Sequence, residues 1–388
     1  MKKRAKNVLL LGGPYMQNFY SRITGLAMER DWYLEMEERY NPPRGWVGDG
    51  VVAMLYDQPV MNGFLDDVLS RGTPVVNIIG VSNRTDLGHV FTDEDALGRM
   101  AAGHFRERNF QHAAFFAFEW TLLHKRRYEA FAAAFGDPAP EKWCWPDEAG
   151  GRSGRDALAE WTASKLASTK KPTAVLTFNA YNASFLARVC RDRGIAVPHE
   201  IAILSGYDNP IHTMHRDQPL SGIIHDSESI CLKAVELLQD MMDGRAPHDA
   251  RIAVPPVGIS VRRSTDAVAA EDPVLRSALA FVSKNMSRPF GLAQVADHAG
   301  VSLERLNAVA RRELGRSMLG EILRQRICEA KRLLTKTDLK LSAIARETGF
   351  CNASYFCKMF RQYVGVSPHG WRRIGAAEGA GLSQAGRS

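Results

Sequence analysis

The stretch Leu341-Ser-Ala-Ile-Ala-Arg-Glu-Thr-Gly-Phe350 has the pattern of a short helix that ends in a glycine turn. The residues that would form its buried face recur at i, i+3, i+4 and i+7, which is helical spacing: Leu341, Ile344, Ala345 and Thr348. Gly349-Phe350 forms the turn, and Asn352 or Ser354 can cap the helix that follows. That helix would be lined by Phe356, Met359, Phe360 and Tyr363. The stretch therefore predicts a helix-turn-helix unit.

A second copy of this pattern begins about 49 residues earlier. Its first helix is expected to bury Leu292, Val295, Ala296 and Ala299. Gly300 permits a turn with positive φ, and Ser302 is a good cap for the next helix. That helix would be buried through Leu306, Val309 and Ala310. One long helical pattern, Met318–Leu334, connects the copies, so two recognition helices could reach successive major grooves, about 34 Å apart.

The positive charge of the chain is concentrated in the same region. Residues 273–374 hold 18 Lys and Arg against 7 Asp and Glu, a net charge of +11. Residues 1–272 hold 31 against 35, a net charge of −4. A basic block of this kind is expected to bind a polyanion through phosphate contacts and counterion release. Two helix-turn-helix units within it favour double-stranded DNA as the partner.

The segment 289–374 resembles the AraC/XylS-type DNA-binding domain. The resemblance rests on Leu341–Phe350, Ser354-Tyr-Phe356, Phe360, Gly365-Val-Ser-Pro368 and Trp371-Arg372. Matching positions imply base contacts by Asn307, Asn352 and Ser354, and phosphate contacts by Arg311, Arg326, Lys358 and Arg361, with Glu304 also on the reading face. Related proteins carry an Arg-Arg-aromatic run where this chain has Ala308-Val309-Ala310. The second unit is therefore expected to do most of the sequence reading.

Residues 1–258 alternate short apolar runs with helical patterns, which indicates parallel sheets covered by helices. The runs are Val8–Leu11, Val51–Tyr56, Val75–Ile79, Ala113–Phe118, Ala174–Phe178 and Ile201–Leu204. The helical patterns include Glu94–Arg108, Lys125–Phe135, Asp156–Ala167 and Ala180–Arg193. About 250 residues is long for one open sheet, so two α/β lobes are expected. Ligands of such folds lie at the carboxyl ends of the strands.

Several segments of this part resemble the LacI-type sensor, which has the two-lobed periplasmic-binding-protein fold. They are Val90–Gly98, Arg127–Phe131, Gly194–Asn209 and Leu220–Asp226. A sensor placed before AraC-type helices, joined through Val261–Asp266, resembles the xylose-regulator subgroup. The resemblance implies a small effector, a sugar above all, that closes the lobes of a homodimer and repositions its DNA-binding domains. RNA polymerase is a further candidate partner.

A cleft that binds a polyol needs bidentate polar groups and aromatic surfaces. The candidate ligand-binding residues, chosen from strand ends and from the stretch near Arg127, are Tyr15, Phe19, Arg127, Asn179, Asp208, Asn209 and His225. Sugar-sensing relatives have Asn-Asp where this chain has Asn179-Ala180, so one carboxylate acceptor is missing. The sequence leaves open a pentose, another ligand, or an N-terminal part that only dimerises.

An enzyme is the other alternative. The chain contains no phosphate loop, no dinucleotide fingerprint, no nucleophile elbow and no His-Glu-x-x-His motif. His212 and His215 could be two metal ligands, but no third ligand is near in sequence, so a surface loop is expected. We expect no catalytic site, no metal site and no cofactor.

The expected organisation follows from these patterns. Residues 1–260 form the sensor, 261–272 a linker, 273–374 an all-α domain with two helix-turn-helix units, and 375–388 a disordered tail. The six cysteines contain no Cys-x-x-Cys pair and are expected to be reduced. No apolar run reaches the roughly 18 residues of a membrane span, and the first apolar run is too short for a signal peptide. A cytoplasmic protein without a membrane partner is expected.

Overall fold

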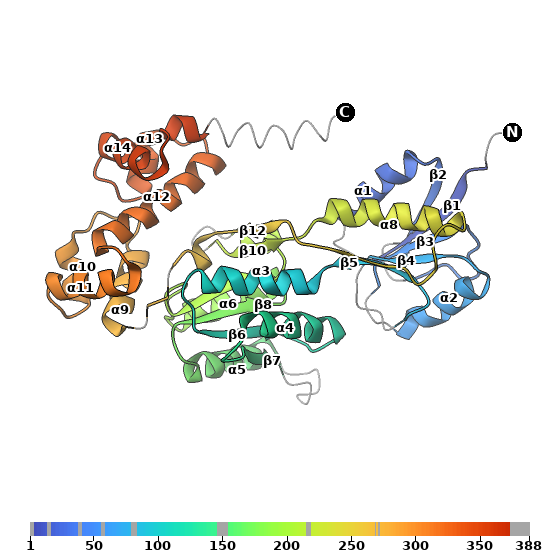
Figure 1. Cartoon of the computed structure of the whole chain (residues 1–388), viewed down its shortest axis with the longest axis horizontal. Helices are drawn as coiled ribbons and strands as arrows, with labels where there is room; N and C mark the ends of the chain where they lie inside the picture. Colours follow the sequence, from blue (N-terminus) through green and yellow to red (C-terminus); the bar gives the residue numbers. More distant parts are fainter. Residues whose placement is uncertain are drawn as a thin grey trace.

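The computed structural model describes residues 4–13, 17–37, 41–55, 59–78, 84–145, 154–214, 219–267, 269–270 and 272–372. Two sheet-containing lobes and one helical domain lie in a row, with the first lobe and the helical domain at opposite ends (Figure 1). The expected tail, 375–388, lies outside the described residues. The expectation of two α/β lobes followed by an all-α domain is confirmed.

The first lobe is built on a six-stranded sheet with the order β11-β5-β4-β3-β1-β2, in which all pairs are parallel. Its strands are β1 (Lys6–Leu11), β2 (Trp32–Glu37), β3 (Gly50–Ala53), β4 (Val75–Asn77), β5 (Gly88–Thr92) and β11 (Arg251–Val254). Val8 and Leu10 share a core with α1 (Gln17–Met28) and α8 (Ser227–Met242). Leu9 and Leu11 share the opposite core with α2 (Pro59–Ser70). The apolar run of β1 is continuous because helices cover both faces of the sheet.

The second lobe repeats this architecture with the order β12-β10-β9-β8-β6-β7. Its strands are β6 (His112–Ala117), β7 (Glu141–Cys144), β8 (Thr173–Thr177), β9 (Ile201–Ser205), β10 (Ser221–Ile224) and β12 (Gly258–Ser260). One face packs against α3 (Glu94–Arg106) and α4 (Leu122–Phe135). The other packs against α5 (Arg155–Ser168) and α6 (Ala180–Asp192), and the short α7 (Pro210–Thr213) follows β9. Among the described strands of this sheet, β12 alone runs antiparallel to its neighbour.

Helices α3 and α4 approach each other closely at Gly98. A Cβ atom on Gly98 would lie 2.5 Å from the carbonyl carbon of Ala130, which is closer than real Cβ atoms come. Glycine is therefore required where the two backbones meet. The absence of a side chain at Gly98 lets α3 pack directly against α4.

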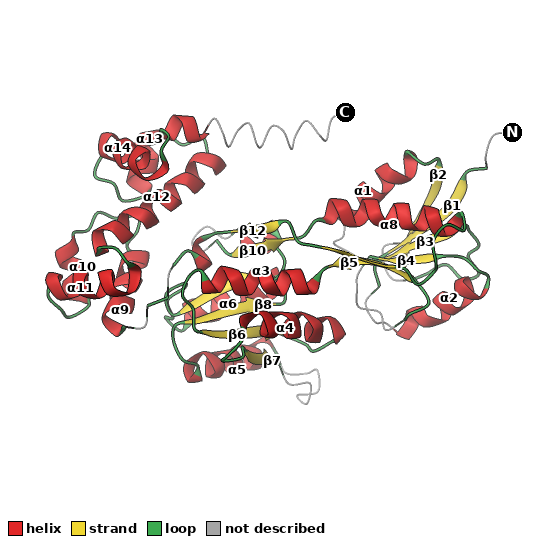
Figure 2. Cartoon of the chain, viewed as in Figure 1, coloured by secondary structure: helices red, strands yellow, loops and turns green. Residues whose placement is uncertain are grey.

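The helical domain contains α9 (Pro273–Lys284), α10 (Leu292–His298), α11 (Leu303–Leu314), α12 (Met318–Lys336), α13 (Leu341–Glu347) and α14 (Ala353–Val364). The described part of this domain contains no strand (Figure 2). Two separate cores form around the two predicted units. The first lies between α9, α10 and α11, and the second between α12, α13 and α14. Helix α12 also reaches the first core through Met318 and Ile322, so one helix connects both.

Sequence patterns predicted some elements better than others. The six apolar runs correspond to β1, β3, β4, β6, β8 and β9, although the ends of two runs, at Tyr56 and Ile79, lie outside the described residues. Strands β2 and β7 were not predicted because they carry charged and aromatic residues rather than an apolar run, and β11 was not predicted because it is short and begins with Arg251. The segment expected to be a linker begins inside the second lobe, where Ser264 and Thr265 are fully buried in a 3₁₀ turn.

Candidate effector site and DNA-binding face

The chain crosses between the two lobes three times, and the crossings are bonded to one another. They connect β5 to α3, β10 to α8, and β11 to β12. The backbone N–H of Asp93 donates to the carbonyl of Val254 (2.8 Å), and that of Val257 donates to the carbonyl of Ile224 (2.8 Å). These bonds make the crossings a common hinge, the usual place of ligand-driven lobe closure.

Arg127 lies beside this hinge, in the second lobe, and is 4% exposed. Its Nε and Nη2 donate to the two carboxylate oxygens of Glu94, both at 2.7 Å. Its Nη1 donates to the carbonyl of Phe178 (2.7 Å), and the guanidinium lies 4.7 Å from the centre of the Phe178 ring. A guanidinium has five N–H donors, so these three bonds leave two for another group.

His225 connects the hinge to the same cluster. Its Nδ1 lies 2.9 Å from the hydroxyl of Thr92, and its Nε2 lies 2.8 Å from the carbonyl of Gly206. Burial and the nearby positive charge of Arg127 lower the pKa of His225 to about 3. The ring is therefore neutral at physiological pH, with its hydrogen bonds set by one tautomer.

The other candidate ligand residues have local partners. The side-chain oxygen of Asn179 caps α6 by accepting from the N–H of Asn182 (2.9 Å), and that of Asn209 accepts from the N–H of Ile211 (3.1 Å). Asp208 forms a bidentate ion pair with Arg262, with distances of 2.8 and 2.7 Å. An effector that bonds to one of these oxygens would share it with the hydrogen bond or ion pair already present.

The two aromatic candidates, Tyr15 and Phe19, come from the stretch that follows β1. Tyr15 lies outside the described residues. Phe19, on α1, is half-buried against the core of the first lobe. The structure thus brings together Arg127 and His225, places Asn179 one residue after Phe178, and keeps Phe19 in the other lobe.

Sequence reasoning missed two members of the cluster, Glu94 and His124. Glu94 begins α3 and holds Arg127, and the ring of His124 stacks on Phe178 with 3.7 Å between ring centres. Burial and the charge of Arg127 lower the pKa of His124 to about 4. The stretch Val90–Gly98, quoted for its family resemblance, contains Glu94, but nothing in it identifies Arg127 as the partner 33 residues away.

Both helix-turn-helix units have the geometry that their sequences predict. Gly300 and Gly349 adopt positive φ of 68° and 71° at the two turns. Ser302 accepts from the N–H of Arg305 (3.2 Å) at the start of α11, and Asn352 accepts from the N–H of Tyr355 (2.8 Å) at the start of α14. The predicted caps are therefore present in both recognition helices.

The candidate DNA contacts differ in how they are placed. Among the candidate residues on the two recognition helices, the exposed ones are Glu304, Arg311, Ser354, Lys358 and Arg361. Asn352 is also exposed, although its side-chain oxygen is used as the cap. These residues form the exposed sides of α11 and α14, as DNA reading requires.

Two other candidates have structural partners. The side-chain oxygen of Asn307 accepts from the N–H of Met318 (3.1 Å) and so helps to fix the start of α12. Arg326 is 8% exposed, lies 4.8 Å from the ring centre of Phe290, and has its pKa lowered by burial. Its burial between the two units argues against a phosphate contact in this conformation.

The described residues contain no cluster of three potential metal ligands and no helix suited to span a membrane. In those parts of the chain, no group of three His, Cys, Asp or Glu side chains could hold a metal ion, and His215 lies outside them. None of the described helices combines the length and the apolar character that a membrane span needs.

Comparison with known proteins agrees with this architecture. Residues 102–265 match the model of a periplasmic binding protein-like domain, and residues 295–374 match that of a helix-turn-helix domain. The xylose operon regulatory protein of Escherichia coli (strain K12) is 24% identical over 373 residues, which cover 90% of this chain and 91% of that protein. The arabinose operon regulatory protein of the same organism is 34% identical over 99 residues, which cover 25% of this chain and 34% of that protein.

A solved structure of a xylose-binding transcription activator has the same overall fold. It superposes with a TM-score of 0.76 at 22% identity, over 96% of this chain and 99% of that one. The fold, the two reading units and the family matches define a DNA-binding transcription regulator in which a periplasmic binding protein-like domain precedes a helix-turn-helix domain. Within that class, the chain is similar to the xylose operon regulators over nearly its whole length.

Proposed function

We propose that a small sugar binds between the two lobes at the hinge and thereby changes how the helical domain engages DNA. The observation that carries this proposal is the cluster of Glu94, Arg127 and His225 at the point where the chain crosses between lobes. Neutral and charged groups that can bind hydroxyls lie there beside the half-buried ring of Phe178. The full-length similarity to xylose operon regulators supports a pentose as the first effector to test.

The cluster suggests a division of roles. Glu94 accepts hydrogen bonds and is held by Arg127, so its carboxylate is positioned before a ligand arrives. His225 is bonded to Thr92 of one crossing and to Gly206 of the second lobe, so it would respond to lobe closure. A ligand that binds the closed arrangement more tightly shifts the population toward it.

The remaining expectations belong to the same proposal. The chain acts as a homodimer in the cytoplasm, where it binds double-stranded DNA and contacts RNA polymerase, and it catalyses no reaction. The relatives are named as regulators of operons, which supports this role. The domain limits of 260, 273 and 374 also remain a proposal, to be tested by limited proteolysis.

The proposal is tested by measuring the melting temperature of the full chain with D-xylose, L-arabinose, D-ribose and D-glucose. A bound sugar stabilises the folded state by RT ln(1 + [L]/Kd), about 2.7 kcal/mol at a hundred times Kd. Arg127→Lys should weaken that shift, because lysine cannot hold Glu94 in a bidentate pair.

Arg193→Lys is the matched control, since Arg193 pairs with Glu160 on the surface of the same lobe and away from the hinge. If no sugar shifts the melting temperature of the wild-type chain, the N-terminal part does not sense these ligands. If Arg193→Lys weakens the shift as much as Arg127→Lys, the cluster is not the binding site.

A further inference from the structure

Asp208 is held by Arg262 within the second lobe. The two side chains are 11% and 12% exposed, and Arg262 reaches both carboxylate oxygens (2.8 and 2.7 Å). The hydroxyl of Thr213 donates to the same carboxylate (2.8 Å). Because the pair is shielded from water, loss of either partner leaves a charge that water cannot fully stabilise.

Four residues later, the chain contacts the DNA-binding domain. Asp266 lies 3.1 Å from Nη1 of Arg324, which is on α12. Arg324 also pairs with Glu321 (2.9 Å), a residue of α12 that is 1% exposed. Since α12 connects the two helix-turn-helix units, Asp266 contacts the helix that both units share.

The residues between these two ion pairs are fixed to the second lobe by hydroxyl groups. Ser264 donates to the carbonyl of Ile203 (2.6 Å) and accepts from the N–H of Ser221 (2.8 Å). Thr265 bonds to the hydroxyl of Ser221 (2.7 Å) and to His104 of α3 (2.8 Å). With both residues fully buried, the segment 262–266 behaves as one body rather than as a flexible tether.

Helix α3 provides a second connection to the same segment. It begins with Glu94 at the hinge, and just beyond its end Arg108 donates to the carbonyl of Thr265 (2.8 Å). Thirteen residues of helix span about 20 Å, at 1.5 Å per residue. Helix α3 therefore connects Glu94 at the hinge with the segment that contains Thr265.

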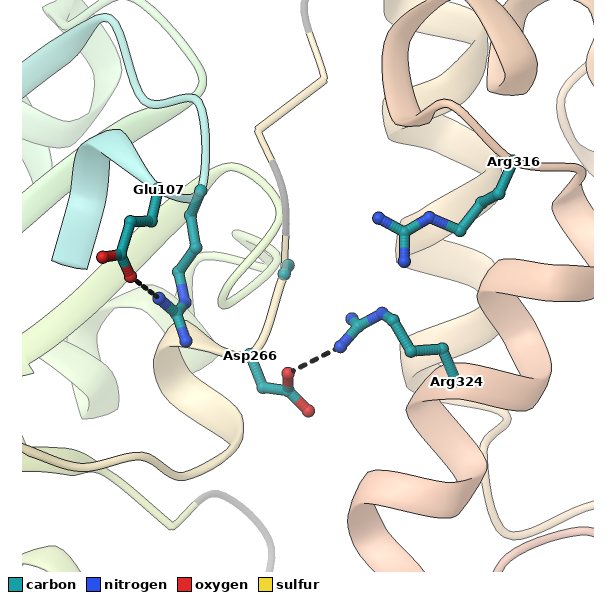
Figure 3. A pocket seen from close by; sticks show the side chains of 6 residues that line it. Glu107, Asp266, Arg316 and Arg324 are labelled. Carbon is teal, nitrogen blue, oxygen red and sulfur yellow. Dashed lines mark hydrogen bonds and ion pairs between the residues drawn. The ribbon is translucent and has the colours of Figure 1, made fainter. Parts of the chain in front are cut away.

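The Asp266–Arg324 contact is one of a few polar contacts between the lobe and the helical domain. Arg263 also donates to the carbonyl and the hydroxyl of Ser283 on α9, and Arg276 of α9 donates to the carbonyl of Lys171. An open pocket of about 210 Å³ separates the lobe from the helical domain, lined by Glu107, Arg108, Asp266, Ala267, Arg316 and Arg324. Figure 3 shows Glu107 and Asp266 on the side of the lobe and Arg316 and Arg324 on the opposite side, with Asp266 bridging the gap to Arg324. A polar contact that borders an open pocket can change without unfolding either domain.

We propose that residues 262–266 form a coupling segment. It transmits the formation or loss of the Asp208–Arg262 ion pair in the sensor to Arg324 on α12. Arg262 is a positioning residue in this segment, since it acts through Asp208 and Asp266 rather than on DNA. A change that releases Arg262 from Asp208 alters the Asp266–Arg324 contact and, through α12, the placement of both reading units relative to the sensor. The link to an effector rests on the proposed function, whereas the coupling itself does not.

The test compares backbone hydrogen exchange in the full-length wild-type chain and in Asp208→Asn, without any effector. We expect exchange about tenfold faster in peptides covering 262–270 and the first turns of α12, because a charge-assisted pair is lost. Peptides of β1 and of α14 should be unchanged. Asp243→Asn is the matched control, because Asp243 pairs with Lys6 in the first lobe.

A second variant keeps the test decisive if Asp208→Asn folds poorly. Asp266→Asn removes only the contact of the segment with Arg324. It should speed hydrogen exchange in α12 and leave exchange in the peptide around Asp208 unchanged. In the double variant, the effect of Asp208→Asn on α12 should be absent. Faster exchange confined to residues 205–224 in Asp208→Asn, or an unchanged α12 in Asp266→Asn, would overturn the coupling segment.

The effector arm uses D-xylose as the probe. If it raises the melting temperature of the wild-type chain, exchange in 262–270 and α12 should change on its addition, and Asp266→Asn should abolish the change in α12. A D-xylose effect on α12 that persists in Asp266→Asn also counts against the segment. If D-xylose does not change the melting temperature of the wild-type chain, the result contradicts the proposed sugar but not the coupling. The coupling is decided by the variants measured without an effector.

Discussion

Asn352 caps α14 with its side-chain oxygen, so replacing it by alanine should lower both folding stability and DNA selectivity. The oxygen accepts from the N–H of Tyr355 at 2.8 Å, and the backbone of Asn352 is extended, as a capping residue requires. Loss of such a cap costs about 1 kcal/mol, within a range of about 0.5–2. If the amide also reads a base, its loss costs about 1–3 kcal/mol of discrimination at one position of the binding site.

Asn352→Ser separates the two roles, since serine keeps a capping oxygen but loses the amide. Urea unfolding of the full chain should show Asn352→Ala less stable by about 1 kcal/mol and Asn352→Ser close to wild type. Titrations against a selected DNA site and its single-base variants should show both variants less selective at the same position. Equal stability of the alanine and wild-type chains would refute the capping argument, and unchanged selectivity in both variants would refute base reading.

Three further outcomes follow from the site. Lys358→Ala should weaken binding to selected and unrelated duplexes by a similar factor and reduce the slope of log K against log salt by about 0.9, measured by titration at several salt concentrations. Arg127→Met should destabilise the sensor by about 3–5 kcal/mol in urea unfolding, because it leaves the Glu94 carboxylate buried without its partner. His104 and His199 are buried with pKa values lowered to about 3, so stability should fall as the pH drops below the unfolded pKa of about 6.5, by about 2 kcal/mol for each between pH 7 and pH 5.

Each of these predictions has a control variant or a result that would contradict it. A salt slope unchanged in Lys358→Ala would remove that residue from the phosphate contacts. Adding Glu94→Gln to Arg127→Met should restore part of the lost stability, since the uncompensated charge is then gone. His199→Gln should reduce the pH dependence of urea unfolding, and an unreduced dependence would mean that other groups cause the acid destabilisation.

The architecture was largely predictable because its signals are local. The apolar runs that became β1, β6, β8 and β9 are buried on both faces, which makes them continuous in sequence. The glycine turns at Gly300 and Gly349 and the caps at Ser302 and Asn352 depend on neighbours within a few residues. Periodicity and turn chemistry record such features directly.

The site was less predictable because its partners are distant in sequence. In the sequence, nothing near Asp208 indicates a partner for its carboxylate. In the structure it pairs with Arg262, 54 residues later. Asn307 lies on a recognition helix, but its oxygen is bound to the start of α12, 11 residues away. Arg326 reads as a phosphate contact until the fold buries it against Phe290. A single sequence contains no record of these long-range contacts.

The continuity of α12 has a consequence for the DNA that the chain can recognise. Nineteen helical residues without a break hold the two reading units at one distance and one rotation. Two stretches of the DNA site are contacted, one by each reading unit. Because the duplex repeats every 10–10.5 base pairs in about 34–36 Å, one added base pair between these stretches rotates one of them by about 35° around the duplex and moves it by about 3.4 Å. A stiff rod follows neither change, so every natural binding site should keep the same internal spacing, whatever its base sequence.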